Sequence, residues 1–142
     1  MLTIGTLSKR TGTKIPTIRY YERIGLLAEP GRTDGGQRRY AETDADRLGF
    51  VRHARQLGFT LEAIRDLLAL SDRPGQSCAH VDAIARTQLR EVETRLARLE
   101  TLRVELQRML AECAGGTVAE CRVLEVLRDH AECLTDHEAV AR

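Results

Sequence analysis

Hydrophobic residues recur at steps of three and four along a stretch without proline or glycine, from Ser77 to Ala114. This spacing places them on one face of a helix, and its sustained repetition is typical of a coiled-coil seam. The apolar positions of the stretch are Ala85, Leu89, Val92, Leu96, Leu99, Leu102, Leu106 and Leu110. The stripe is too narrow and too long to be buried by a chain of 142 residues folding alone. The pattern therefore predicts a partner helix.

Two short helical patterns precede this stretch near the N-terminus. The first starts after Thr3, a plausible N-cap, and closes at Gly12; the second has Pro16 in its first turn and stops at Gly25. Two short helices around a glycine-bearing turn indicate a helix-turn-helix, whose second helix enters the major groove of DNA. The residues of that helix expected to face DNA are Lys14, Thr17, Arg19 and Tyr20, whereas Ile18 is expected in the core.

A turn-rich segment from Glu29 to Tyr40 follows and predicts a hairpin wing. Its basic and hydroxyl side chains suit contacts with backbone phosphates, and they are Arg32, Arg38, Arg39 and Tyr40. A third helix, capped by Thr43, and a fourth, capped by Thr60, come next. The break at residues 72–75 then predicts a domain boundary ahead of the long helix.

Three cysteines lie at the ends of the long helix. Cys78 and Cys113 are 35 positions apart, which is roughly 52 Å along a helix, so they can meet only if two chains pair antiparallel. Cys121 follows Cys113 by eight positions across a glycine-bearing loop that can turn its thiol back. The sequence thus predicts a three-thiolate site shared between two subunits. The alternative is that these cysteines are small apolar residues filling seams.

Charge is distributed unevenly although the net charge is only +1. Residues 1–60 carry eleven Lys and Arg against six Asp and Glu, whereas residues 61–142 carry eleven against fifteen. A basic module joined to an acidic helical one fits a DNA reader attached to a dimerising and sensing part. Without a signal peptide or a membrane span we expect a cytoplasmic protein with no membrane contact, in which cysteines serve as metal ligands or reactive thiols.

The chain resembles the MerR family of bacterial transcriptional regulators in three runs. They are Ile4-Gly5-Thr6-Leu7-Ser8, then Thr17-Ile18-Arg19-Tyr20-Tyr21-Glu22-Arg23-Ile24-Gly25-Leu26-Leu27, then Gln37-Arg38-Arg39-Tyr40. The resemblance implies a homodimer held by an antiparallel coiled coil and a second wing touching phosphates, which the match places on Arg52 and Arg55. It also implies that an effector makes the dimer distort over-long promoter DNA, so that RNA polymerase engages both promoter elements.

The resemblance also narrows the effector. Monovalent-metal sensors of the family carry Ser at the position of Cys78, and a third thiolate suits a divalent soft ion: Zn, Cd, Pb or Hg. The implied ligands are Cys113 and Cys121 of one subunit with Cys78 of the other. His130, Cys133 and His137, spaced by three and four, either act as auxiliary ligands or are simply exposed. A Cu(I)-type monovalent sensor and a thiol-based redox or electrophile sensor remain as alternatives.

The expected fold is mainly α, in three parts. Residues 1–75 form a winged helix-turn-helix DNA-binding domain, residues 76–113 a coiled-coil dimerisation helix, and residues 114–142 a metal-binding loop with a short helix and tail. No pairing of nucleophile and base, or of carboxylates, stands out, so we expect no enzyme activity.

Overall fold

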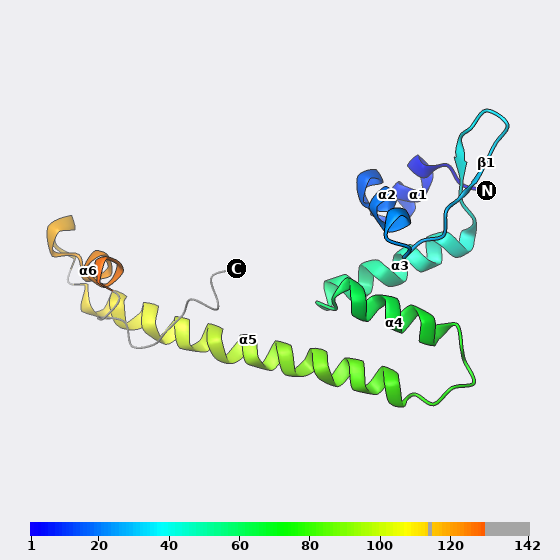
Figure 1. The fold of residues 1–142 in the computed structure, drawn as a ribbon. Helices are drawn as coiled ribbons and strands as arrows, with labels where there is room; N and C mark the ends of the chain where they lie inside the picture. Colours follow the sequence, from blue (N-terminus) through cyan, green and yellow to red (C-terminus); the bar gives the residue numbers. More distant parts are fainter. Residues whose placement is uncertain (114, 130–142) are drawn as a thin grey trace. The chain divides into compact units, whose positions relative to one another are not determined.

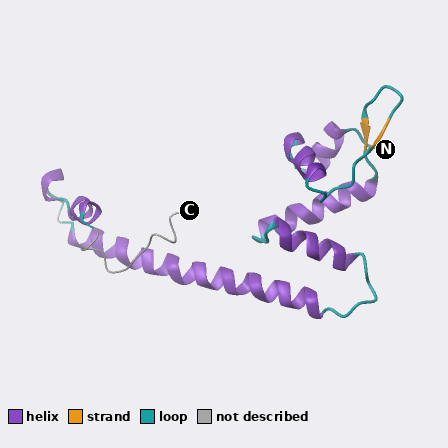
Figure 2. Cartoon of the chain, in the orientation of Figure 1, coloured by secondary structure: helices purple, strands orange, loops and turns teal. Residues whose placement is uncertain are grey.

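The computed structural model of the chain describes residues 1–113 and 115–129, and it confirms the mainly α fold (Figures 1 and 2). It divides into two compact units, Met1–Ile84 and Ala85–Arg142, and each is described by itself. The predicted boundary at residues 75 and 76 stays a prediction. The elements are α1 (Ile4–Thr11), α2 (Ile15–Arg23), β1 (Gly31–Arg32), β2 (Arg38–Arg39), α3 (Glu42–Gln56), α4 (Leu61–Ser71), α5 (Ala79–Glu112), the 3-10 helix η1 (Val118–Glu120) and α6 (Arg122–Arg128).

Two of the three threonines predicted to cap helices do so. The Thr3 and Thr60 hydroxyls accept the backbone N–H groups three residues ahead, each at 3.1 Å, at the starts of α1 and α4. The prediction that Thr43 caps α3 is wrong, because Ala41 is the N-cap. There the Asp44 carboxylate accepts the Ala41 N–H at 2.8 Å and satisfies the helix start in place of a hydroxyl.

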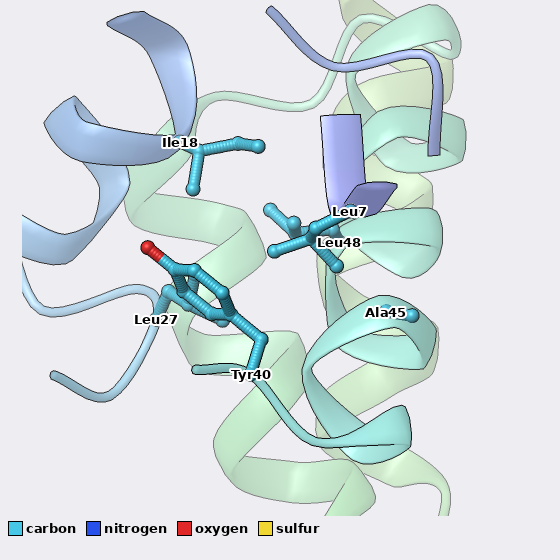
Figure 3. Close-up of a cluster of buried hydrophobic side chains, with 6 residues drawn as sticks. All are labelled: Leu7, Ile18, Leu27, Tyr40, Ala45 and Leu48. Carbon is cyan, nitrogen blue, oxygen red and sulfur yellow. The ribbon is translucent and has the colours of Figure 1, made fainter. Parts of the chain in front are cut away.

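The first unit has two adjoining hydrophobic clusters. One gathers side chains from α1, α2, the wing and α3: Leu7, Ile18, Leu27, Tyr40, Ala45 and Leu48 (Figure 3). The other joins α3 to α4 through Leu26, Val51, Ala54, Ile64 and Leu68. Ile18 is fully buried, as predicted. Helix α2 is therefore held in one core with α1 and α3.

The predicted wing is a short antiparallel hairpin. Gly31 pairs with Arg39 and Arg32 with Arg38, and Tyr40 continues the hairpin with two backbone hydrogen bonds to Leu2, at 2.7 and 2.8 Å. The wing is therefore joined to the segment that leads into α1.

The predicted long helix is present as α5, with 34 residues. Its apolar stripe is exposed: Leu89, Leu96, Leu99, Leu106 and Leu110 each keep more than half of their surface accessible. A row of exposed leucines on one helix is typical of surfaces that associate with other proteins, and the predicted partner helix stays a prediction. Among the described residues, none of the helices is both long and apolar enough to cross a membrane.

Candidate DNA-binding surface and metal centre

The start of α2 and the end of α3 border an open hollow of about 390 Å³. Its lining includes four side chains predicted to face DNA, namely Lys14, Thr17, Arg52 and Arg55. The Arg52 guanidinium donates to the Thr11 carbonyl at 2.8 Å, and that of Arg55 to the Phe59 carbonyl at the same distance. A guanidinium has five N–H donors, so one such bond fixes its position and leaves donors for a phosphate.

A second hollow, of about 300 Å³, lies between α2 and the wing. It is lined by the other predicted DNA-facing arginines, which are Arg19, Arg32, Arg38 and Arg39. Four guanidinium groups around one concave surface create a strongly positive potential, which attracts a phosphate backbone. The predicted reading helix and the predicted wing thus contribute to one basic surface.

Tyr40 lies inside the molecule, and this corrects its predicted contact with a phosphate. Its ring lies in the hydrophobic cluster and is fully buried (Figure 3), and its hydroxyl donates to the Glu22 carboxylate. Burial, followed by that hydrogen bond, raises the pKa of Tyr40 above its usual range. Arg38 Nε lies 3.5 Å from the same carboxylate. Tyr40 and Glu22 therefore hold the wing against α2 from within, and Tyr40 leaves the set proposed to touch DNA.

Glu22 is the functional side chain that the sequence reading missed. Only 8% of its side chain is exposed, and it contacts both the core tyrosine and a wing arginine. In the sequence, this buried contact is indicated only by the position of the glutamate, which directly follows two tyrosines in a basic helix. By contrast, Tyr20 is 41% exposed with the Arg23 guanidinium 5.7 Å from its ring centre, in keeping with its predicted place at the surface.

The structure brings two of the predicted metal ligands together. Cys113 directly follows α5, and Cys121 is the N-cap of α6. The pKa of the Cys121 thiol is lowered, chiefly by the backbone N–H of Leu124 in the first turn of α6. The Val123 N–H and the Cys113 thiol add to this effect, while desolvation and Glu125 oppose it. Cys121 is thus held by donors that favour a thiolate, the form that binds a metal.

Cys78, the third predicted ligand, lies at the opposite end of α5 from this pair. Cys78 is exposed, immediately precedes α5, and belongs to the first compact unit. Within residues 1–113 and 115–129, no three His, Cys, Asp or Glu side chains of one chain gather in a way that could hold an ion. The predicted auxiliary residues His130, Cys133 and His137 lie outside the described residues.

Comparisons with known proteins agree with these features. Residues 2–71 match the model of the MerR HTH family regulatory proteins, and residues 45–109 match that of the MerR DNA-binding region. The chain is 42% identical to the transcriptional regulator ZntR of Escherichia coli K12 over 134 residues, covering 92% of this chain and 95% of ZntR. It is 39% identical over 112 residues to the mercuric resistance operon regulatory protein of Pseudomonas fluorescens, covering 79% of this chain and 76% of that protein.

A solved relative extends the agreement to three dimensions. The transcription regulator PbrR691 of Ralstonia metallidurans CH34, crystallised with lead(II), superposes with a TM-score of 0.77 at 38% identity, covering 89% of this chain and 99% of PbrR691. Family models, sequence relatives and this structure all identify the same group of proteins. The chain belongs to the MerR family of transcriptional regulators.

Proposed function

We propose that this chain is a metal-responsive transcription regulator that binds promoter DNA as a homodimer in the cytoplasm and has no enzyme activity. A divalent soft metal ion, Zn, Cd, Pb or Hg, is the effector. The observation that carries the proposal is the pair of neighbouring thiols, Cys113 directly after the long helix and Cys121 at the start of α6, which close one loop between them. Paired soft sulfur ligands fit soft metal ions.

The third ligand in this proposal comes from the second subunit. A helix of 34 residues is about 51 Å long, so Cys78 at its start and Cys113 at its end cannot bind one ion within a single chain. An antiparallel pair of α5 helices would bring Cys78 of one subunit to Cys113 and Cys121 of the other. The exposed leucines of α5 support this pairing, because pairing would remove them from water.

The divalent class of the metal follows from the number of thiols. Two thiolates suit a monovalent ion in linear geometry, whereas a third adds the charge and coordination that a divalent ion needs. The relatives point the same way: PbrR691 was crystallised with lead(II), and another regulates a mercuric resistance operon. When bound, the ion would link the two subunits at each end of the coiled coil and fix their relative position.

The DNA-binding units would convert that fixed position into promoter control. In each subunit, the two basic hollows at α2 and the wing supply cations for phosphates and bases. Two such units, held at a set separation, can bend and untwist the DNA between them at a deformation cost that the contacts offset. The distorted promoter would then allow RNA polymerase to engage both of its promoter elements.

A purified transcription assay tests the proposal. Wild type, Cys113→Ser and the same-loop control Thr117→Ser would be compared with polymerase and promoter, with and without each divalent metal. We expect metal-dependent transcription for wild type and Thr117→Ser. Cys113→Ser should bind promoter DNA normally but lose induction. Loss of DNA binding by Cys113→Ser would show that the cysteine is structural, and full induction would remove it from the site.

A further inference from the structure

An ion pair closes the base of the loop that carries the two cysteines. Cys113 and Cys121 are the first and last residues of this loop, and the pair is formed by the residues immediately outside them. Arg122 Nε donates to Glu112 Oε2 at 2.6 Å. The bond joins the last residue of α5 to the first residue of α6, and Figure 1 shows α6 beside the end of α5.

This ion pair is the centre of a row of five alternating charges. Arg108 donates to Glu105 at 2.8 Å and to Glu112 at 3.2 Å, and Arg122 donates to Glu125 at 3.1 Å. The row therefore runs from the interior of α5, where Glu105 is only 5% exposed, to α6. An isolated surface pair contributes little, but side chains that already share partners lose less freedom when each bond forms.

Apolar side chains also contribute to this contact. Among the described residues of the second unit, Met109 on α5 and Val126 on α6 are buried, and Val123 and Leu124 on α6 are partly buried. The ion pairs act together with this packing to keep α6, and with it Cys121, at the end of α5.

We propose that Arg122 is a positioning residue for the thiol pair, which it holds together through Glu112 before any metal binds. The inference rests on the proposed metal-sensing function. A loop whose ends are already joined loses little chain entropy when both thiols bind one ion. The ion pair at the base of the loop therefore raises the affinity of the two thiols for the metal. In this role Arg122 is not a metal ligand and acts only through the separation of the two cysteines.

A metal-free measurement tests the role directly. In a Cys78→Ser, Cys133→Ser background, the full-length protein would be equilibrated with reduced and oxidised glutathione. Forming the Cys113–Cys121 disulfide releases two glutathione thiols for each oxidised glutathione consumed, so its equilibrium constant reports how often the two thiols meet. Arg122→Met should lower that constant about fivefold, which corresponds to about 1 kcal/mol, the upper range for an exposed ion pair.

Two matched variants separate positioning from a general loss of structure. Arg122→Lys keeps a cation at the loop base and should recover most of the equilibrium constant. Arg128→Met removes the same charge from an exposed position of the same helix and should match the unsubstituted background. An equal fall for Arg128→Met, or no fall for Arg122→Met, would overturn the proposal.

Metal affinity gives an independent second readout. In the otherwise native chain, Arg122→Met should weaken lead(II) binding about fivefold, with the number of ions per dimer unchanged. If wild type binds no metal while the glutathione measurement behaves as expected, the proposed function fails and the positioning role stands. If wild type binds metal and Arg122→Met binds it equally well, the positioning role fails alone.

Discussion

Gly12→Ala should destabilise the first unit more than replacement of another glycine with positive φ, because Gly12 lies against the Arg52 guanidinium. Gly12 has φ +66°, and a Cβ there would lie 1.5 Å from Arg52 Nη1. That nitrogen donates to the Thr11 carbonyl at 2.8 Å, so the guanidinium must leave its bond to make room. The left-handed backbone costs about 1 kcal/mol for alanine, and a lost charged hydrogen bond adds about 1.5 kcal/mol.

Gly36→Ala is the matched control for this experiment. Gly36 has φ +81°, and a Cβ added there would meet no atom within 4 Å, so its replacement costs only the backbone term, about 1 kcal/mol. Urea unfolding followed by tyrosine fluorescence reports on the first unit alone, since all three tyrosines lie there. We expect a loss of about 2.5 kcal/mol for Gly12→Ala. An equal loss of unfolding free energy in the two variants would refute the reasoning, because it would show that the Arg52 guanidinium is not held in place beside Gly12.

Three further outcomes are expected. Tyr40→Phe should lower the free energy of unfolding in urea by about 2 kcal/mol, the value of a buried charged hydrogen bond, and leave the salt dependence of DNA binding unchanged; a change in that dependence would return Tyr40 to the DNA surface. Arg19→Ala and Arg38→Ala should each weaken operator binding and reduce the salt slope by about one, with the dimer intact by light scattering; unchanged affinity at physiological salt would count against the docking surface. Because the pKa of Cys121 is lowered in the folded chain, its thiolate stabilises the fold at high pH, and that stability is lost as the pH falls through the lowered pKa. In Cys113→Ala the pKa of Cys121 should rise, which a pH titration followed by thiolate absorbance measures. An unchanged pKa would contradict the contact between the two thiols.

The parts of the fold with a local cause were predictable from the sequence. Thr3 and Thr60 cap helices because a hydroxyl at that position satisfies a free N–H, whatever the rest of the fold does. The end of α1 at Gly12 has the same local origin, since its positive φ suits glycine. Cys121 could be expected beside Cys113 because two glycines separate them.

The features that sequence reasoning missed depend on contacts between distant residues. Tyr40 looked like a surface residue of a basic wing, but its backbone pairs with Leu2 and its ring is buried in the core, where Glu22 accepts a hydrogen bond from its hydroxyl. Arg122 and Glu112 are ten positions apart, a spacing that no helical or strand pattern links. They meet only because α6 folds back on α5, which the periodicity of either helix alone does not reveal.

The central claim is that Cys78 of one subunit and Cys113 and Cys121 of the other bind one divalent soft metal ion. A competitive titration of the reduced dimer with Zn, Cd, Pb, Hg and Cu(I), following thiolate-to-metal charge-transfer absorption, tests it most directly, with wild type beside Cys78→Ser. We predict tight divalent binding that Cys78→Ser abolishes while Cu(I) binding survives. Absence of divalent binding, or a preference for Cu(I) that does not depend on Cys78, would contradict the account and favour a monovalent-metal or oxidant sensor.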